Sequence, residues 1–479
     1  MKDLIERLYA TYLQSRRVTT DSRAITPGCI FFAFKGEHFD GNAFAPTALE
    51  QGAACCVISD AQYKVDDRCV VVPDVLATLQ ELARHHRSQL TIPVIGITGT
   101  NGKTTTKELV HAVLSRRYRT AATKGNFNNH LGVPLTLLSI PADAELAIVE
   151  MGANHPGEIA FLCGIADPDC GLITNVGRAH LEGFGSFEGV VQTKTELYRH
   201  LAGKHGLVFV NADNERLMHE AERLATLPGL RSVIPAYAPD NPAFVPDTIE
   251  RTPLSLLTYG RANDADIRGT LVNCLNANIS NNSSNQPIKQ SSNPYLRFYF
   301  EVGDQVYNVQ SKLLGDYNFD NCMAAVAVGL HFGVEPFDIK EAIENYQPSN
   351  QRSEWKQTQR NCLYLDCYNA NPSSMAAAIA SFRNMEASHK MAIIGGMHEL
   401  GSAEHSEHEK LVEMLAECQL EQVLLVGPEW EGLPHPDNML LFPDTEAIAH
   451  FLRQNPVNGA TLLIKGSNTN RLWTLEEEL

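Results

Sequence analysis

One stretch, IPVIGITGTNGKTTTKE at residues 92–108, constrains the fold more than any other part of this chain. Its apolar first half predicts a buried strand that ends at Thr98, and residues 99–102 form a glycine-rich loop. Residues 103–105, Lys-Thr-Thr, then open a helix with an apolar stripe. The order strand, glycine loop, Lys-Thr and helix is typical of a phosphate-binding loop. A tight strand-to-helix turn with an accidental Gly-Lys-Thr is the structural alternative.

The residue types of this loop suit an anionic ligand. Glycines let backbone N–H groups turn inward around phosphate oxygens, and the helix N-terminus adds its partial positive charge. The Lys103 ammonium can reach the outer phosphates, and the Thr104 hydroxyl can ligate Mg²⁺. The residues expected to bind nucleotide here are Gly99, Thr100, Asn101, Gly102, Lys103, Thr104 and Thr105.

Length and charge limit the remaining possibilities. A chain of 479 residues is too long for one hydrophobic core. Its net charge of −17 argues against nucleic acid or an anionic membrane as the main partner. The first residues lack the apolar core of a signal peptide, and no apolar run has a membrane-spanning length. The sequence therefore predicts a cytoplasmic protein, expected to be monomeric, that acts on small molecules.

The order of predicted elements indicates an α/β fold with three domains. A small α/β N-terminal domain is expected at residues 1–90, and a central P-loop ATPase-like parallel sheet at 91–312. A Rossmann-like, doubly wound C-terminal sheet is expected at 313–479. The Asn/Ser-rich segment 276–293 cannot supply a core, so we interpret it as a surface insert in a hairpin. None of the cysteines has CxxC spacing, which argues against a structural zinc site.

Polar residues follow the predicted strands of the central domain. Glu150 ends an apolar strand, a position that commonly holds Mg²⁺ or water in phosphate-loop domains, although it can also simply face solvent. His180 lies in a glycine-rich loop at the same sheet end, where a merely polar surface role is equally open. Lys194, taken alone, reads as a solvated lysine in the middle of a helix. The asparagines of 126–129 suit either a ligand or a capped turn.

Four strand-like runs alternate with helices in the C-terminal third, and polar residues crowd their carboxyl ends. These runs cover 362–366, 391–395, 422–426 and 461–464. Ligands favour that edge of a doubly wound sheet. Asn371 also fits a purely local role, as the cap of a helix with proline at its first position. In the N-terminal domain the loop KGEHFDG (35–41) is, from composition alone, more typical of a plain surface turn.

Across nearly its whole length the chain resembles the Mur ligase family. The matching stretches are DSR (21–23), FKGEHFDG (34–41), GTNGKTTT (99–106), GNFNNHLGVP (125–134), VEMGANHPGEI (149–159), TNVGRAHLEGFGS (174–186), YNANPSSM (368–375), MHELG (397–401) and KGS (465–467). The motifs YNANP and MxELG resemble those of the family member that adds a D-alanyl-D-alanine dipeptide. Folylpolyglutamate synthases share the phosphate loop but are not expected to carry these two motifs.

The resemblance implies an ATP-dependent ligase of peptidoglycan precursor synthesis. ATP would phosphorylate the terminal carboxylate of UDP-N-acetylmuramoyl-tripeptide, and the amine of D-alanyl-D-alanine would attack the acyl phosphate. Phosphorylation supplies the leaving group that a carboxylate lacks, so the protein would position the reactants and neutralise charge. Thr104 and Glu150 would hold one Mg²⁺, and His180 and a carbamylated Lys194 a second. Lys103, Glu150, His180 and Lys194 would form the catalytic group.

The same resemblance assigns the remaining contacts. Asn321 would contact adenine, and Arg352 and Asp366 would bind the nucleotide from the C-terminal domain. The substrate-binding residues would be Ser22, Arg23, Lys35, Gly36, Asp40, Gly41, Asn126, Asn128, Asn129, Tyr368, Asn371, His408 and Lys465.

Two rival functions remain open at this point. One is another amide ligase of the same superfamily, which adds glutamate to a folate or an amino acid to an earlier muramyl precursor. The other is a nucleotide-driven switch or transport ATPase, which would need a partner surface and would turn over without a small acceptor. Polar residues at the strand ends of both later domains favour a catalytic cleft.

Overall fold

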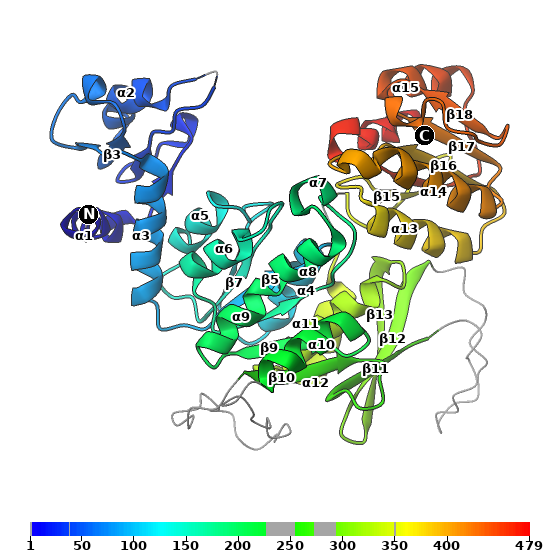
Figure 1. Cartoon of the computed structure of the whole chain (residues 1–479), viewed down its shortest axis with the longest axis horizontal. Coiled ribbons are helices and arrows are strands. Elements are labelled where there is room, and N and C mark those ends of the chain that lie inside the picture. The colour runs from blue at the N-terminus through cyan, green and yellow to red at the C-terminus, as the bar shows by residue number, and fades with distance from the viewer. Residues whose placement is uncertain (1, 38, 227–253, 273–293, 349–350) are drawn as a thin grey trace.

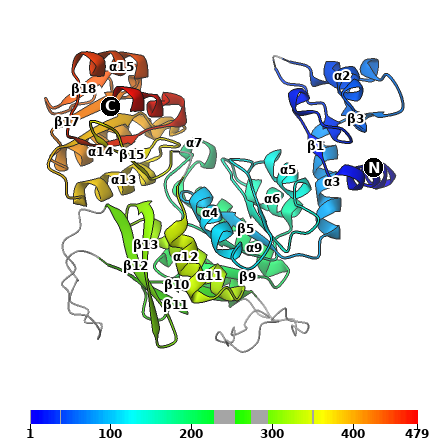
Figure 2. The same ribbon diagram turned by 180° about the vertical axis from the view of Figure 1, so that it is seen from behind.

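The computed structural model describes residues 2–37, 39–226, 254–272, 294–348 and 351–479. Within these residues the fold has three β-sheets in succession along the chain, of four, nine and six strands. Figures 1 and 2 show the N-terminal and C-terminal sheets on opposite sides of the central one. Within the described residues, no helix combines the length and the apolar character needed to cross a membrane.

The N-terminal sheet is small and parallel, in the order β1-β2-β3-β4. The strand β3 is apolar and fully buried, as expected for a strand covered on both faces. Asp74 begins the last helix by accepting a hydrogen bond from the Ala77 N–H, and this helix, α3, packs on α5 and α6 of the central domain. The elements are α1 (Lys2–Ser15), β1 (Val18–Thr19), β2 (Ile30–Phe32), α2 (Ala45–Glu50), β3 (Cys55–Ile58), β4 (Cys69–Val71) and α3 (Val75–Gln89).

The central sheet has the order β13-β12-β11-β10-β9-β8-β5-β7-β6. The strands from β6 to β11 pair in parallel, as predicted, whereas β12 and β13 add an antiparallel edge. Its elements are β5 (Val94–Thr98), α4 (Lys103–Leu114), β6 (Thr120–Ala122), α5 (Gly132–Leu138), β7 (Leu146–Glu150), α6 (Glu158–Ala166), β8 (Cys170–Ile173), α7 (Leu181–Phe184), α8 (Phe187–Lys194), α9 (Glu196–Gly203), β9 (Leu207–Asn211), α10 (Glu215–Ala225), β10 (Ser255–Gly260), β11 (Ile267–Leu271), β12 (Tyr295–Val302) and β13 (Gln305–Leu314).

The Asn/Ser-rich segment 276–293 lies outside the described residues. The strands on either side of it, β11 and β12, pair antiparallel, with Thr270 opposite Tyr299. This pairing confirms the predicted hairpin strands on both sides of the segment.

The C-terminal sheet has the order β14-β15-β19-β16-β17-β18 and is parallel except for β14. Helices α13 and α14 pack on one face and α15 on the other, which confirms the doubly wound fold. The four predicted strands are present, and β14 and β18 extend the sheet at its edges. The elements are β14 (Glu354–Gln357), β15 (Cys362–Asp366), α13 (Pro372–Asn384), β16 (Lys390–Gly395), α14 (Glu404–Glu417), β17 (Gln422–Val426), β18 (Met439–Phe442), α15 (Thr445–Gln454) and β19 (Thr461–Lys465).

The predicted boundary between residues 312 and 313 falls inside β13, which belongs to the central sheet. The helices that follow, α11 (Asn318–His331) and α12 (Pro336–Asn345), also pack on the central domain, where α11 lies beside α4 (Figure 2). Helix α11 is buried on almost all sides, and most of its side chains are small or apolar. Its sequence pattern therefore does not indicate which sheet it packs against. We therefore propose that the C-terminal domain begins after α12, in the segment that leads to β14.

Candidate active site

A cavity of about 630 Å³ lies where the carboxyl end of the central sheet faces the C-terminal domain. Strands β5, β7 and β8 deliver polar loops to this edge, and β15 and β19 deliver others from the opposite side. The predicted residues that line the cavity are Thr100, Asn101, Gly102, Lys103, Thr104, Thr105, Asn128, Asn129, Glu150, His180, Asn321, Arg352, Asp366, Tyr368 and Lys465.

The loop after β5 has a backbone that only glycine fits. Gly99 and Gly102 have φ values of 142° and 77°, in the region that side chains disfavour. A Cβ atom at Gly99 would lie 2.0 Å from Thr174 Oγ1, and one at Gly102 would lie 2.4 Å from Asn321 Oδ1. Helix α4 begins directly after Gly102 without a side-chain cap, so its first N–H groups remain available to an anion.

Lys103 lies over its own loop. Its Nζ donates hydrogen bonds to the carbonyls of Gly99 and Thr100, each at 2.9 Å. Burial lowers the pKa of Lys103 to about 8, although the Glu150 carboxylate acts in the opposite direction. This ammonium is therefore held at the mouth of the loop, close to where phosphate oxygens would lie.

Glu150 is the buried acid of the site, with 1% of its surface exposed. Its Oε1 accepts hydrogen bonds from Thr104 Oγ1 at 3.2 Å and Asn128 Nδ2 at 2.8 Å. Its Oε2 has no hydrogen-bond partner among the described residues, and the nearest cation, Lys107 Nζ, is 4.0 Å away. A carboxylate oxygen without a donor, beside a threonine hydroxyl, is the kind of oxygen ligand that Mg²⁺ prefers.

A metal ion here would need more than protein side chains. In the described part of the chain, no three His, Cys, Asp or Glu side chains are grouped closely enough to hold an ion. Mg²⁺ usually keeps several waters and binds through one or two carboxylates plus substrate phosphates. The pair formed by Thr104 and Glu150 fits that pattern.

Lys194 is buried at the end of α8, with 2% of its surface exposed. Its Nζ donates to the Ala153 carbonyl at 3.2 Å and lies 5.3 Å from the centre of the Phe184 ring. Burial, reinforced by the charge of Lys103, holds the pKa of Lys194 well below its usual value. The solvated helix lysine considered from the sequence is therefore wrong. Lys194 lies behind the cavity wall, because Ala153 lines the cavity and Lys194 does not.

His180 lies at the start of α7 with a left-handed backbone, φ 49°. Its ring lines the cavity, and its Nδ1 contacts Oε2 of Glu399 from the C-terminal domain. Burial lowers the pKa of His180, while the Glu399 carboxylate opposes that shift.

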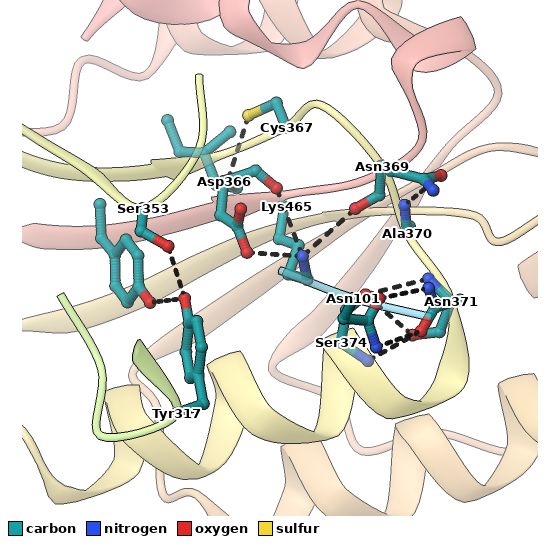
Figure 3. A network of polar contacts seen from close by, with 12 residues as sticks. Asn101, Tyr317, Ser353, Asp366, Cys367, Asn369, Ala370, Asn371, Ser374 and Lys465 are labelled. Carbon is teal, nitrogen blue, oxygen red and sulfur yellow. Dashed lines mark hydrogen bonds and ion pairs between the residues drawn. The ribbon is translucent and has the colours of Figure 1, made fainter. Parts of the chain in front are cut away.

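The C-terminal domain supplies two further cations. The Arg352 guanidinium stacks 3.7 Å from the centre of the Tyr368 ring. Lys465 is 1% exposed, and its Nζ donates to Asp366 Oδ2 at 2.6 Å (Figure 3). On the facing domain, Asn321 accepts a hydrogen bond from the Thr106 hydroxyl at 2.9 Å. Positively charged side chains therefore reach the cavity from both domains, an arrangement that suits a polyanionic ligand.

Asn371 contacts the phosphate loop directly. Its side chain caps α13 by accepting from Ser374 N at 2.9 Å, which confirms the predicted local role. The same amide donates to Asn101 Oδ1 at 2.8 Å (Figure 3). The cap of a C-terminal helix therefore contacts the nucleotide loop of the central domain.

Several predicted residues lie away from the cavity. His408 is buried beneath the MHELG segment, where its Nε2 accepts from Met397 N at 3.0 Å, so it supports that loop instead of lining the site. Asn126 is exposed and does not line the cavity. The predicted residues of the N-terminal domain do not line the cavity either; they are Ser22, Arg23, Lys35, Gly36, Asp40 and Gly41.

Sequence reasoning missed three residues at this site. Lys107 is 3% exposed and faces Glu150, one helical turn after Lys103. Asn175 accepts from Asn101 N at 3.0 Å and so fixes the tip of the phosphate loop. Glu399 contacts His180 from another domain. The spacing of four residues from Lys103 could have indicated Lys107, and the TNVGRAH stretch could have indicated Asn175. No local sequence feature pairs Glu399 with His180.

A phosphate-binding loop on a parallel sheet, facing a doubly wound sheet across a cation-rich cavity, defines a three-domain nucleotide-binding protein of the P-loop type. Family models agree with this class along most of the chain. Residues 15–87 match the model described as Mur ligase family, catalytic domain. Residues 97–228 match the Mur ligase middle domain, and residues 351–468 match the Mur ligase, glutamate ligase domain.

Curated relatives and a solved structure extend the match to nearly the whole length. The chain is 30% identical to the UDP-N-acetylmuramoyl-tripeptide–D-alanyl-D-alanine ligase of Bacillus subtilis (strain 168), over 96% of this chain and 92% of that protein. It is 32% identical to the enzyme of the same name from Escherichia coli (strain K12), over 86% and 81%. The crystal structure of MurF ligase from Thermotoga maritima in complex with ADP has a TM-score of 0.77 at 27% identity, covering 97% of each chain. This chain belongs to the Mur ligase family.

Proposed function

We propose that this protein is an ATP-dependent ligase that joins D-alanyl-D-alanine to UDP-N-acetylmuramoyl-tripeptide in peptidoglycan precursor synthesis. The relatives that match it over nearly their full length carry this activity in their names. One structural observation supports the chemistry most directly. The Glu150 Oε2 accepts no hydrogen bond from any residue that the structure describes, and the carboxylate lies beside the Thr104 hydroxyl, near the N-terminus of helix α4, which has no side-chain cap.

The residues of the cavity match the charge that such a reaction must accommodate. The tripeptide carboxylate accepts the γ-phosphoryl group of ATP, the dipeptide amine attacks the resulting acyl phosphate, and phosphate leaves. Lys103 and the first N–H groups of α4 neutralise the transferring phosphoryl oxygens. Arg352 and Lys465 approach the same space from the C-terminal domain. Holding both reactants in one cavity makes the attack effectively intramolecular.

Two Mg²⁺ ions would provide the remaining positive charge. Thr104 and Glu150 are the ligands proposed for the first ion, and His180 and Lys194 for the second. Mg²⁺ bound there would shield the phosphate charges and polarise the phosphoryl oxygens. Because the ions would also bind substrate phosphates, the protein needs only a few ligands of its own.

Lys194 suits this role only as a carbamate, the form we propose for it. Carbamylation requires a neutral amine, and burial of Nζ favours that form. The product is a carboxylate-like group that replaces a cation with an oxygen ligand. The short distance from Nζ to the Ala153 carbonyl places this lysine one residue layer from the cavity.

The N-terminal domain would hold the UDP end of the substrate, through Ser22, Arg23 and the loop that contains Lys35, Gly36, Asp40 and Gly41. In this loop the backbones of Lys35 and Asp40 form an isolated antiparallel β-bridge. A Cβ atom at Gly41 would lie 2.3 Å from the Phe34 carbonyl oxygen. We further propose that the enzyme works in the cytoplasm, where ATP and UDP-linked sugars are found, and that it is a monomer.

The deciding experiment measures phosphate release by the purified protein with ATP and Mg²⁺. Release should require both UDP-N-acetylmuramoyl-tripeptide and D-alanyl-D-alanine, with a new amide product detected by mass spectrometry. Glutamate with a folate, or a single amino acid with an earlier muramyl precursor, should not replace them. Release without any acceptor would instead favour the switch or transport ATPase.

A further inference from the structure

His180 and Glu399 meet across the boundary between the central and C-terminal domains. His180 lines the cavity, whereas Glu399 does not. An ionised carboxylate can only accept hydrogen bonds, so the imidazole must donate from Nδ1. In neutral imidazole this leaves the Nε2 lone pair free to accept a hydrogen bond or bind a metal ion. The contact therefore decides which ring nitrogen faces the reactants.

The backbone on both sides of this contact is unusual. His180 and Glu399 have φ values of 49° and 61°, in the left-handed region that non-glycine residues seldom occupy. Such conformations persist where the surroundings hold them, and they cluster at functional sites. Here the Glu182 N–H donates to the Glu399 carbonyl at 3.5 Å, and the buried His408 holds the start of the same loop through the Met397 N–H.

We propose that Glu399 is a positioning residue for His180, which fixes the tautomer and orientation of the imidazole when the C-terminal domain is docked. A carboxylate that orients a histidine in this way is a general device at metal and catalytic sites. In this protein the histidine and the carboxylate belong to different domains. Docking of the C-terminal domain would then both close the cavity and prepare His180 for its task. This inference rests on the proposed function for its kinetic test only.

The chain offers a matched control for the docking contact itself. Arg178, two residues before His180, forms an ion pair with Glu407 at 2.9 Å across the same boundary. Neither Arg178 nor Glu407 lines the cavity, and neither contacts the His180 ring. The variant Glu407→Gln therefore weakens docking without removing the partner of His180. It separates loss of docking from loss of orientation.

The first test reads the tautomer by NMR of the full-length protein labelled with ¹⁵N in its histidine rings. The His180→Gln variant assigns the signal. Wild type and Glu407→Gln should show a proton on Nδ1, whereas Glu399→Ala should move it to Nε2. Glu399→Gln keeps an acceptor oxygen and should keep the wild-type tautomer. An unchanged tautomer in Glu399→Ala would overturn the proposal.

The second test compares steady-state kinetics of the same variants. Glu399→Ala should lower kcat by about 10- to 100-fold, the usual cost of losing such an orienting partner, while KM for ATP stays within about twofold. Glu407→Gln should retain kcat within about twofold, and unchanged thermal melting confirms folding. Equal losses in both variants, or no loss in Glu399→Ala, would refute a positioning role. A wild-type protein that does not ligate would refute the proposed function instead, and the tautomer test would still stand.

Discussion

Asn101 of the phosphate loop and Asn371 of the C-terminal domain hydrogen bond to each other in both directions through their side-chain amides. Asn371 Nδ2 donates to Asn101 Oδ1 at 2.8 Å, and Asn101 Nδ2 donates back at 3.4 Å. Because Asn175 also holds the Asn101 backbone, the tip of the loop is fixed from both domains. The nucleotide loop therefore contacts the C-terminal domain directly through protein side chains.

This amide pair predicts separable effects for two substitutions. Asn371→Ser keeps a helix cap but cannot reach Asn101, so KM for ATP should rise about 2- to 10-fold, the value of one hydrogen bond, with stability unchanged. Asn371→Ala should also lose about 1 kcal/mol of stability, because α13 loses its cap. Nucleotide titrations and thermal melts check both. If the two variants have the same affinity for ATP as wild type, the pair has no part in binding.

Lys103→Ala should lower ligation by at least about 100-fold, because a preorganised cation opposite the transferring phosphoryl group is lost. Its two hydrogen bonds go to the carbonyls of its own loop, so the core should not change. Phosphate release and thermal melting measure the two effects. Near-normal ligation by a folded variant would contradict the assignment of this loop to ATP.

Lys194→Ala should nearly eliminate activity, and short carboxylic acids should partly restore it by occupying the vacated space. Lys194→Arg should stay inactive, because guanidinium stays charged and cannot be carbamylated. The direct observation is a ¹³C carbamate signal after incubation with ¹³C-bicarbonate, present in wild type and absent in both variants. Full activity in a correctly folded Lys194→Arg variant would rule out the carbamate.

The interface between α1 and α3 should weaken in acid. His86 is buried there, its Nε2 3.4 Å from the Tyr12 hydroxyl, and burial lowers its pKa from about 6.5 to about 4. Between those values the unfolded state binds a proton that the folded state does not, so stability falls with falling pH. The loss reaches at most about 3 kcal/mol.

Hydrogen-exchange protection factors of the amides of Lys2–Ser15, compared at pH 7 and pH 4.5, measure this effect. His86→Gln should flatten the acid dependence, because glutamine keeps hydrogen bonding and does not titrate. His85→Gln, the neighbouring position on α3, provides the control. An acid dependence that survives in His86→Gln would locate its origin elsewhere.

A substrate that must contact both the N-terminal domain and the cavity predicts a domain movement, because no described residue of the N-terminal domain lines the cavity. We propose that Ser22 and the loop 35–41 bind the UDP end of the substrate. The tripeptide carboxylate of the same substrate would react beside the Mg²⁺ ligands Thr104 and Glu150. One substrate must therefore span both regions. Addition of an ATP analogue with the tripeptide substrate should therefore make the molecule more compact in solution scattering. Superimposable curves with and without these ligands would argue against closure.

The sequence alone determined what depends on local pattern. A phosphate loop needs a strand, two glycines that can adopt positive φ values, and a helix. Strand β5, the two glycines and helix α4 all appear where residues 94–114 predict them. Continuous apolar runs likewise located the strands of the C-terminal sheet, because burial on both faces favours apolar residues at nearly every position of a strand. The polar residues after those strands meet at the cavity since parallel strands bring their carboxyl ends to one edge.

The tertiary structure decided which partner each element meets. The pattern of α11 predicts burial, but only packing assigned this helix to the central sheet instead of the C-terminal one. Lys194 looks solvated by its spacing and is buried because Ala153 and Phe184 cover it. The contact between His180 and Glu399 joins residues from two domains. Local sequence pattern indicates the elements and their apolar faces, whereas the burial of a polar residue such as Lys194 and the contacts between distant segments arise only when the domains pack against one another.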